Sequence, residues 1–156
     1  MTDPPSRPAL VPELIVSDFE RSLAFYGVLG FTTRYARPEE RFAYLDREGA
    51  HLMIEQSTGR RFLVGDLEAP YGRGVNLQIE VADATALYAM AGGAAAIALG
   101  ASTYLPLEDK WYCRGEEWTG SRQFIVQDPD GYLLRFAERL GTRPEPPEGT
   151  SKHVPD

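Results

Sequence analysis

The sequence predicts an α+β fold in which one βαβββ module is used twice, and a repeat in the chain carries this prediction. Leu14–Asp18 runs into a helical stretch, and 65 residues later Ile79–Asp83 does the same. Each half then ends in a strand that begins at a glycine, Gly49–Glu55 and Gly131–Ala137. A unit repeated at a fixed offset buries in each copy the face that the other leaves open. We therefore expect two modules whose curved mixed sheet forms a cleft.

The first module is predicted over residues 9–56, after a flexible arm at 1–8 that has three prolines and little to bury. The short apolar segment 9–16 is typical of a buried strand. Ser17–Glu20 matches a capping box, in which the serine caps a free backbone N–H and the glutamate reaches back. The following helix is expected to end at Leu29, before a glycine. Three further strands are predicted at 31–36, 41–46 and 50–56.

The second module is predicted over residues 74–138, after a linker at 57–73 in which apolar residues do not alternate. A strand at 75–81 precedes Asp83, which is expected to cap a helix that runs to about Ala91. The boundary of the next segment, up to Gly100, stays open. The remaining elements are a hairpin of strands 103–113 and 118–127, a tight turn at 128–131 and a strand at 132–137. Residues 139–156 are predicted to be a disordered tail, which leaves 9–138 as a single domain.

Composition excludes several classes of protein. The chain has 156 residues, and 43% hydrophobic and 25% charged residues are typical of a globular domain. A net charge of −7 argues against a nucleic-acid partner. We expect no membrane segment and no signal peptide, since the apolar runs are short. The single cysteine, Cys113, excludes an intrachain disulfide and favours a cytoplasmic location.

Three motifs resemble the vicinal oxygen chelate superfamily, and within it the glyoxalase/bleomycin resistance group. They are Val16–Tyr26, Leu29-Gly-Phe31 and Gln127–Tyr132. The resemblance covers about residues 9 to 138 and implies the paired βαβββ fold. It leaves the reaction open, because this fold hosts isomerases, ring-cleaving dioxygenases, transferases and drug-binding proteins without catalysis.

The resemblance also identifies four strand positions where enzymes of the superfamily hold a divalent metal. Here they carry Val11, Met53, Asn76 and Arg135. Valine has no donor atom, methionine suits soft ions, and arginine brings a positive charge to the place of a cation. His51 and Glu55 share a strand face, but four residues separate their backbones by about 13 Å. We therefore predict no metal, no other cofactor and no catalytic residue.

The ligand-binding prediction rests on aromatic and charged side chains of the strands. The hairpin carries both tryptophans, and rings beside carboxylates suit a flat or cationic molecule. Arg135 lies among apolar neighbours and should face a wet cleft or pair with an acid, because a lone buried charge is costly. The predicted ligand-binding residues are Phe42, Tyr44, Glu55, Asn76, Asp109, Trp111, Tyr112, Trp118 and Arg135. The alternative is that the aromatic side chains lie in the core, and for Phe42 and Phe124 we prefer this alternative.

Three functions remain open. The preferred one is a metal-free protein that sequesters an aromatic or cationic, bleomycin-like antibiotic; the resemblance implies that it is a homodimer. The alternative is a metal-dependent enzyme, either a glyoxalase-type lyase or isomerase or a ring-cleaving dioxygenase. The third is a regulatory or accessory protein that shares only the fold.

Overall fold

The computed structural model describes residues 7–57 and 62–150, and it confirms the two βαβββ modules. The first module consists of β1 (Glu13–Ile15), α1 (Phe19–Val28), β2 (Thr32–Arg37), the 3-10 turn η1 (Pro38–Glu40), β3 (Phe42–Arg47) and β4 (Ala50–Glu55). The second consists of β5 (Asn76–Glu80), α2 (Ala84–Ala91), α3 (Ala94–Ala98), β6 (Ser102–Arg114), β7 (Glu117–Gln127) and β8 (Leu133–Arg143). The segment left open by the sequence therefore contains a short helix, α3.

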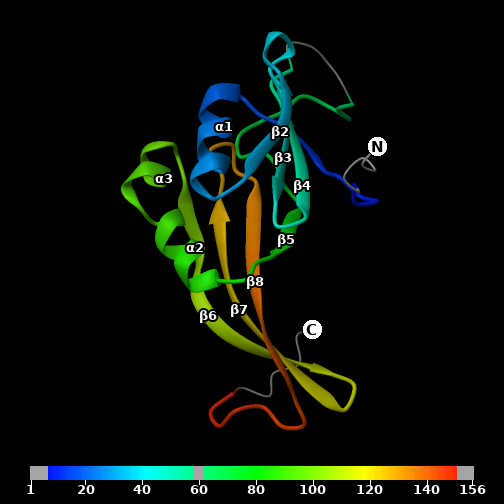
Figure 1. The fold of residues 1–156 in the computed structure, drawn as a ribbon, viewed down its shortest axis with the longest axis vertical. Helices are drawn as coiled ribbons and strands as arrows, with labels where there is room; N and C mark the ends of the chain where they lie inside the picture. The colour runs from blue at the N-terminus through cyan, green and yellow to red at the C-terminus, as the bar shows by residue number, and fades with distance from the viewer. Residues whose placement is uncertain (1–6, 58–61, 151–156) are drawn as a thin grey trace, which may run out of the picture.

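Each module has its own four-stranded sheet with the same topology. The strand orders are β1-β4-β3-β2 and β5-β8-β7-β6, and in both sheets the first pair is parallel and the others are antiparallel. The two sheets follow one another along the long axis of the molecule, with the helices on one side (Figure 1). The predicted mixed sheet is thus confirmed as two separate sheets that share one pattern.

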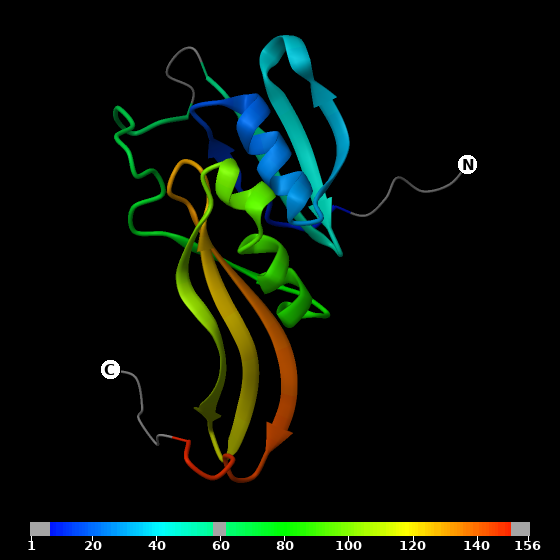
Figure 2. The ribbon, with the colours of Figure 1, turned by 90° about the vertical axis from the view of Figure 1, so that its left-hand side faces the viewer.

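The helices cover one face of each sheet and form the core with it. Leu52 and Ile54 of β4 and Leu134 and Phe136 of β8 are fully buried on this side. One cluster of buried apolar residues includes side chains from both modules. Figure 2 shows that β6, β7 and β8 continue well beyond the helices, so the far part of this sheet has no helix over it.

Both long helices begin at an aspartate. Asp18 accepts a hydrogen bond from the backbone N–H of Arg21 at 3.0 Å, and Asp83 accepts one from Ala86 at 2.9 Å. Asp83 was the predicted cap. The predicted capping box is wrong in its cap residue, because Ser17 instead donates from its backbone N–H and its hydroxyl to Asp130.

A buried polar cluster joins the two modules. The Tyr26 hydroxyl of α1 donates to Asp128 at 2.8 Å, and Asp128 also accepts from the backbone N–H groups of Asp130 and Tyr132. The Tyr132 hydroxyl donates in turn to the carbonyl of Ile15 in the first sheet. Burial raises the pKa of Asp128 to about 6, although the hydrogen bonds act in the opposite direction.

The last strand is longer than predicted. β8 extends to Arg143, where it still pairs with Trp118 of β7, so residues 139–143 belong to the sheet and not to the predicted tail. These residues are poor in apolar side chains, and backbone pairing with β7 holds them in the sheet. The rest of the predicted arm, linker and tail contains no helix or strand within the described residues, and positions 1–6, 58–61 and 151–156 lie outside them. No helix within the described ranges is long and apolar enough to span a lipid bilayer.

Candidate functional site

The open face of the second sheet forms a groove of about 510 Å³. Strand alternation produces it, because Phe124 and Phe136 point to the helices while their neighbours point the other way. All four strands of the sheet contribute polar side chains. They include Gln78 and Glu80 of β5, Tyr112 and Arg114 of β6, Thr119, Ser121 and Gln123 of β7, and Arg135 and Arg139 of β8.

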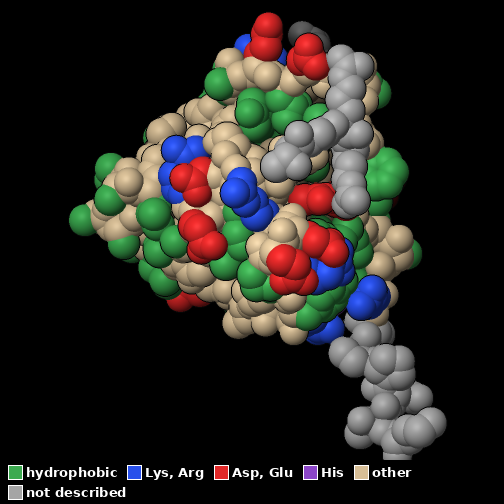
Figure 3. Space-filling view, turned by 90° about the horizontal axis from the view of Figure 1, so that it is seen from above, with side chains coloured by type: hydrophobic (Ala, Val, Ile, Leu, Met, Phe, Trp, Pro, Cys, Tyr) green, Lys and Arg blue, Asp and Glu red, His purple; other side chains and the backbone are tan. Residues whose placement is uncertain are grey.

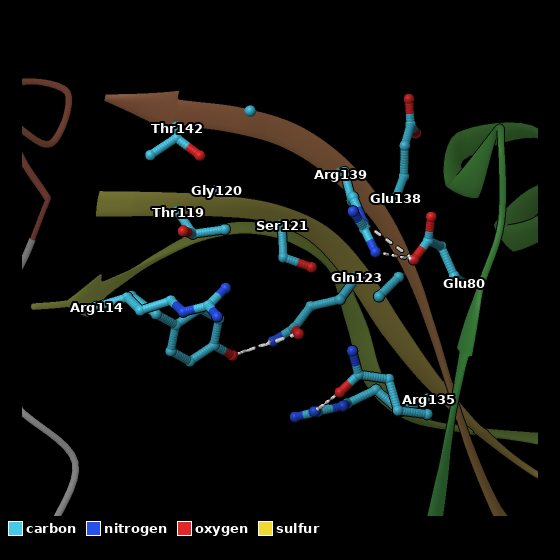
Figure 4. A pocket seen from close by; sticks show the side chains of 14 residues that line it. Glu80, Arg114, Thr119, Gly120, Ser121, Gln123, Arg135, Glu138, Arg139 and Thr142 are labelled. Carbon is cyan, nitrogen blue, oxygen red and sulfur yellow. Dashed lines mark hydrogen bonds and ion pairs between the residues drawn. The ribbon is translucent and has the colours of Figure 1, made fainter. Parts of the chain in front are cut away.

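Hydrogen bonds order the middle of the groove. The amide nitrogen of Gln123 donates to Glu108 at 3.1 Å and lies 3.0 Å from the Tyr112 hydroxyl. Arg139 pairs with Glu80 at 2.8 Å, and Arg135 donates to the side-chain carbonyl of Gln78 (Figure 4). The groove is therefore a polar surface on which several lining side chains are hydrogen-bonded to one another.

The structure separates the predicted residues of the second module. Tyr112 and Arg135 line the groove, whereas Asn76 lines a second hollow of about 350 Å³ beside Tyr71 and Tyr104. Asp109 forms a two-pronged pair with Arg122 at 2.8 and 3.0 Å, on the side of the sheet that faces away from the groove. The predicted set therefore does not converge on one site.

The tryptophans also lie on the far side. Trp111 is opposite Gly120 in the hairpin and packs its ring against that glycine, with the Arg143 guanidinium 5.0 Å from the ring centre. Trp118 shares this face by alternation. Neither tryptophan is among the residues that line the groove, so a role of either one in ligand binding stays a prediction. The tryptophans were expected in the cleft because charged residues flank them in the sequence. In a pleated strand, however, adjacent side chains point to opposite faces.

Phe42, Tyr44 and Glu55 lie on the open face of the first sheet, and all three are buried. The Arg37 guanidinium lies 4.1 Å from the ring centre of Phe42, and that of Arg7 lies 5.2 Å from the ring of Tyr44. This face therefore already holds two of the chain's own cations on aromatic rings.

On the same face, both ring nitrogens of His51 lie near polar side chains. Nδ1 lies 2.7 Å from the Tyr44 hydroxyl, and Nε2 lies 3.5 Å from a carboxylate oxygen of Asp46. The four positions identified for a metal do not form a set of metal ligands. In the strand register Met53 lies beside Glu13, and the cationic Arg135 lies beside Gln78. Within the described residues, no three His, Cys, Asp or Glu side chains gather in a way that could hold an ion. The donor set does not fit a divalent metal.

Several groove residues escaped the sequence analysis, among them Gln78, Arg114, Gln123 and Arg139. A signal for two of them was present. Once Phe124 is placed in the core, alternation puts Gln123 on the opposite face, and Gln78 occupies the same relation to buried Ile79. Arg139 was lost because the folded domain was predicted to end before it.

No family model and no curated protein matches the chain. A glyoxalase/bleomycin resistance protein/dioxygenase superfamily member from Vibrio splendidus 12B01 is 40% identical, over 82% of this chain and 95% of that one, with a TM-score of 0.39. A glyoxalase-related enzyme from Fulvimarina pelagi is 21% identical over 85% and 88% of the two chains, with a TM-score of 0.59. A bleomycin resistance determinant encoded on the transposon Tn5 is 22% identical over 86% and 99%, with a TM-score of 0.54. The first protein is related to this chain by its sequence identity, whereas the other two show only that the fold is shared.

Proposed function

This chain belongs to the glyoxalase/bleomycin resistance protein/dioxygenase superfamily, and from this premise we propose that it captures a small, partly aromatic molecule reversibly and without a metal ion. A bleomycin-like antibiotic, aromatic or cationic, is the first candidate. Sequestration needs a shaped and ordered surface but no reacting group. The proposal includes a homodimer in the cytoplasm.

One observation carries the proposal: the strand positions that would hold a metal lack donor atoms suited to it. Val11 offers none, Met53 offers a soft sulfur, and Arg135 is permanently cationic. The groove on the second sheet supports capture, because its volume lies within the range of about 300–1,000 Å³ that is usual for ligand sites. The aromatic face of the first module is not part of this proposal, because Phe42 and Tyr44 are buried and already carry the guanidinium groups of Arg37 and Arg7.

The first test is the metal content of protein purified without chelators, measured by mass spectrometry. We expect only traces. One equivalent of zinc, nickel, manganese or iron that survives dialysis would overturn the proposal and favour a metal-dependent lyase, isomerase or dioxygenase.

The second test is thermal unfolding with metal-free bleomycin. A ligand at 100 times its Kd adds about 2.7 kcal/mol to the free energy of unfolding. Tyr112→Ala and Trp111→Ala form a matched pair, because the two side chains are adjacent in sequence but lie on opposite faces. We expect Tyr112→Ala to lose the stabilisation and Trp111→Ala to keep it. The reverse result would move the site to the far side of the hairpin. Sedimentation of the purified protein tests the homodimer.

A further inference from the structure

Arg135 has an unusual environment for a charged side chain. It lies in β8 between β5 and β7, and it shares the groove with Gln78, to which it donates one guanidinium N–H. Its Nε is buried and has no acceptor within hydrogen-bond distance in the described part of the chain. Because this Nε–H is closed off from the groove, a ligand reaches the guanidinium through its Nη1 group, which has no partner in the described part of the chain.

The charges around Arg135 do not neutralise it. Arg139 is paired with Glu80, and Glu138 accepts from the backbone N–H of Ala84 at 3.1 Å. Arg114 and Arg135 have no acidic partner among the described residues. The groove wall therefore carries one more arginine than glutamate, with two of its three guanidinium groups outside any ion pair within the described ranges, in a chain whose net charge is −7.

Basic and acidic side chains are interspersed over the end of the molecule seen in Figure 3. In the groove, by contrast, the guanidinium groups of Arg114 and Arg135 both extend toward the region beside Gln123 (Figure 4). The positive charge is thus concentrated where ordered polar side chains already line a hollow.

We propose that Arg135 anchors an oxyanion-binding subsite in this groove, and that the natural ligand presents a carboxylate or phosphate group to it. This inference rests on the proposed function and names the chemistry of one end of the ligand. The free Nη1 group of Arg135 offers two charged N–H donors to the oxygens of a carboxylate or phosphate. The bond to Gln78 fixes the rotation of the guanidinium, and Arg114 supplies a second positive charge at the rim.

The subsite excludes one arrangement of the ligand. A cationic group placed in this part of the groove would meet the unpaired charges of Arg114 and Arg135. A ligand that also carries a cation must direct it away from these two arginines. The captured molecule is therefore anionic, or zwitterionic with its anionic group in the second module.

Four probes of similar size test the inference by isothermal titration at low salt: phenyl phosphate, benzoate, benzamidine and benzyl alcohol. We expect phenyl phosphate or benzoate to bind saturably and the cationic and neutral probes not to compete. The better of the two anions distinguishes a phosphate from a carboxylate ligand. Failure of both anions to bind, or tighter binding of benzamidine, overturns the inference. It leaves metal-free capture itself untouched, which metal content tests; saturable binding of an anion without a shift by bleomycin would replace the cationic candidate by an anionic one.

Variants locate the subsite. Arg135→Gln should weaken binding of the anionic probe by about tenfold or more, since a hydrogen bond to a charged group is lost. Arg122→Gln is the matched control, because it changes the net charge equally but lies on the far face, and its affinity should stay within about twofold of the native protein. Equal losses in both variants would reduce the effect to general electrostatics and overturn the subsite.

A measurement on the native protein tests the inference even if Arg135→Gln does not fold. The Nη resonances of Arg135 should move on addition of the anionic probe, because an Nη1 proton gains an acceptor. Arg135→Lys keeps the charge but loses the planar guanidinium donors, and it should bind more weakly than the native protein. Unmoved Nη resonances under saturating probe contradict the inference even if no variant folds.

Discussion

In the first module the open face of the sheet is aromatic and buried, whereas in the second module the same face is a polar groove. Tyr44 and Phe42 are almost fully buried and carry the guanidinium groups of Arg7 and Arg37. The corresponding face of the second module exposes a charged wall centred on Arg135. The faces directed at the helices are alike in both modules, because both contribute to one apolar core.

The difference indicates which part of a duplicated module is free to change. Met53 and Arg135 each lie four residues after the glycine that begins the last strand, and both face away from the helices. Ile54 and Phe136, one position later, are fully buried under the helices and remain apolar. Core packing constrains one face of each sheet, so the two modules differ in chemistry on the other face.

The largest expected effect tests whether the two helix-facing surfaces form one cooperative core. Phe136→Ala should lower the free energy of unfolding by about 3–5 kcal/mol, because it leaves a cavity in the shared core. Chemical denaturation should still show a single transition. Phe62→Ala, at a side chain that is 96% exposed, is the control and should change little. Two separate transitions would mean that the modules unfold independently.

The glycines that begin the last strands offer a sharper comparison. Gly49 and Gly131 both have positive φ, +89° and +102°, but only at Gly131 would a Cβ meet another residue, Pro70 at 2.5 Å. Gly49→Ala should cost about 1 kcal/mol from backbone strain alone. Gly131→Ala should cost about 2–4 kcal/mol, since overpacking is added. Equal losses in urea denaturation would contradict the close contact at Pro70.

Two aspartates in equivalent places, three residues before these glycines, should respond to pH in opposite ways. The pKa of Asp128 is raised from 3.8 to about 6, so protonation stabilises the folded chain. Its contribution is complete below pH 3.8 and is lost as the pH rises through about 6. Asp128→Asn removes this titration, because the amide can still accept and the Tyr26 hydroxyl can rotate to accept in turn. The stability difference between native protein and variant should change by up to about 3 kcal/mol across this range.

Asp46 is the control for that experiment. Its partial burial opposes ionisation, but hydrogen bonds from Arg34 and the backbone of Gly49 outweigh it and lower the pKa. Its contribution is therefore present above pH 3.8 and is lost as the pH falls below that value. In the native protein the free energy of unfolding should fall in acid as Asp46 is protonated, and Asp46→Asn should lack this part of the fall. If both variants changed the pH profile in the same direction, the contrast between the two turns would be wrong.

The smallest expected effect concerns the cations stacked on aromatic rings. Arg7→Ala removes the guanidinium over Tyr44, and Arg143→Ala removes the one over Trp111. Each should cost at most about 1 kcal/mol in urea denaturation, as is usual at exposed sites. Only Arg143→Ala should alter tryptophan fluorescence. A larger loss for Arg7→Ala would show that the N-terminal arm stabilises the first module.

The fold could be predicted from the sequence because its signals are local. Gly49 and Gly131 mark the starts of equivalent strands, and Asp83 marks a helix start that the structure confirms. Cap selection at Ser17 failed because its partner, Asp130, lies 113 residues away. β8 was predicted too short because strand pairing depends on the neighbouring strand and not on the apolar content of its own residues.

The candidate site was less predictable, for a physical reason. Tyr112 and Arg135 were identified, but Trp111 and Trp118 were placed on the groove side because their neighbours in sequence are polar. Which face of a hairpin becomes a groove depends on where the helices pack, and that follows from the whole fold. Phe124, by contrast, was correctly favoured for the core, where it is fully buried.

The length of β6 creates a hazard that its own residues counteract. As the outermost strand of its sheet, it presents thirteen residues of backbone with one side unpaired, which is a template for aggregation. Pro106 removes one donor from that edge, Glu108, Asp109 and Lys110 place charges along it, and two register irregularities interrupt its regular pairing. The solubility of the protein should therefore depend on Pro106 and the three charged residues 108–110 more than on any feature of the groove that this strand borders.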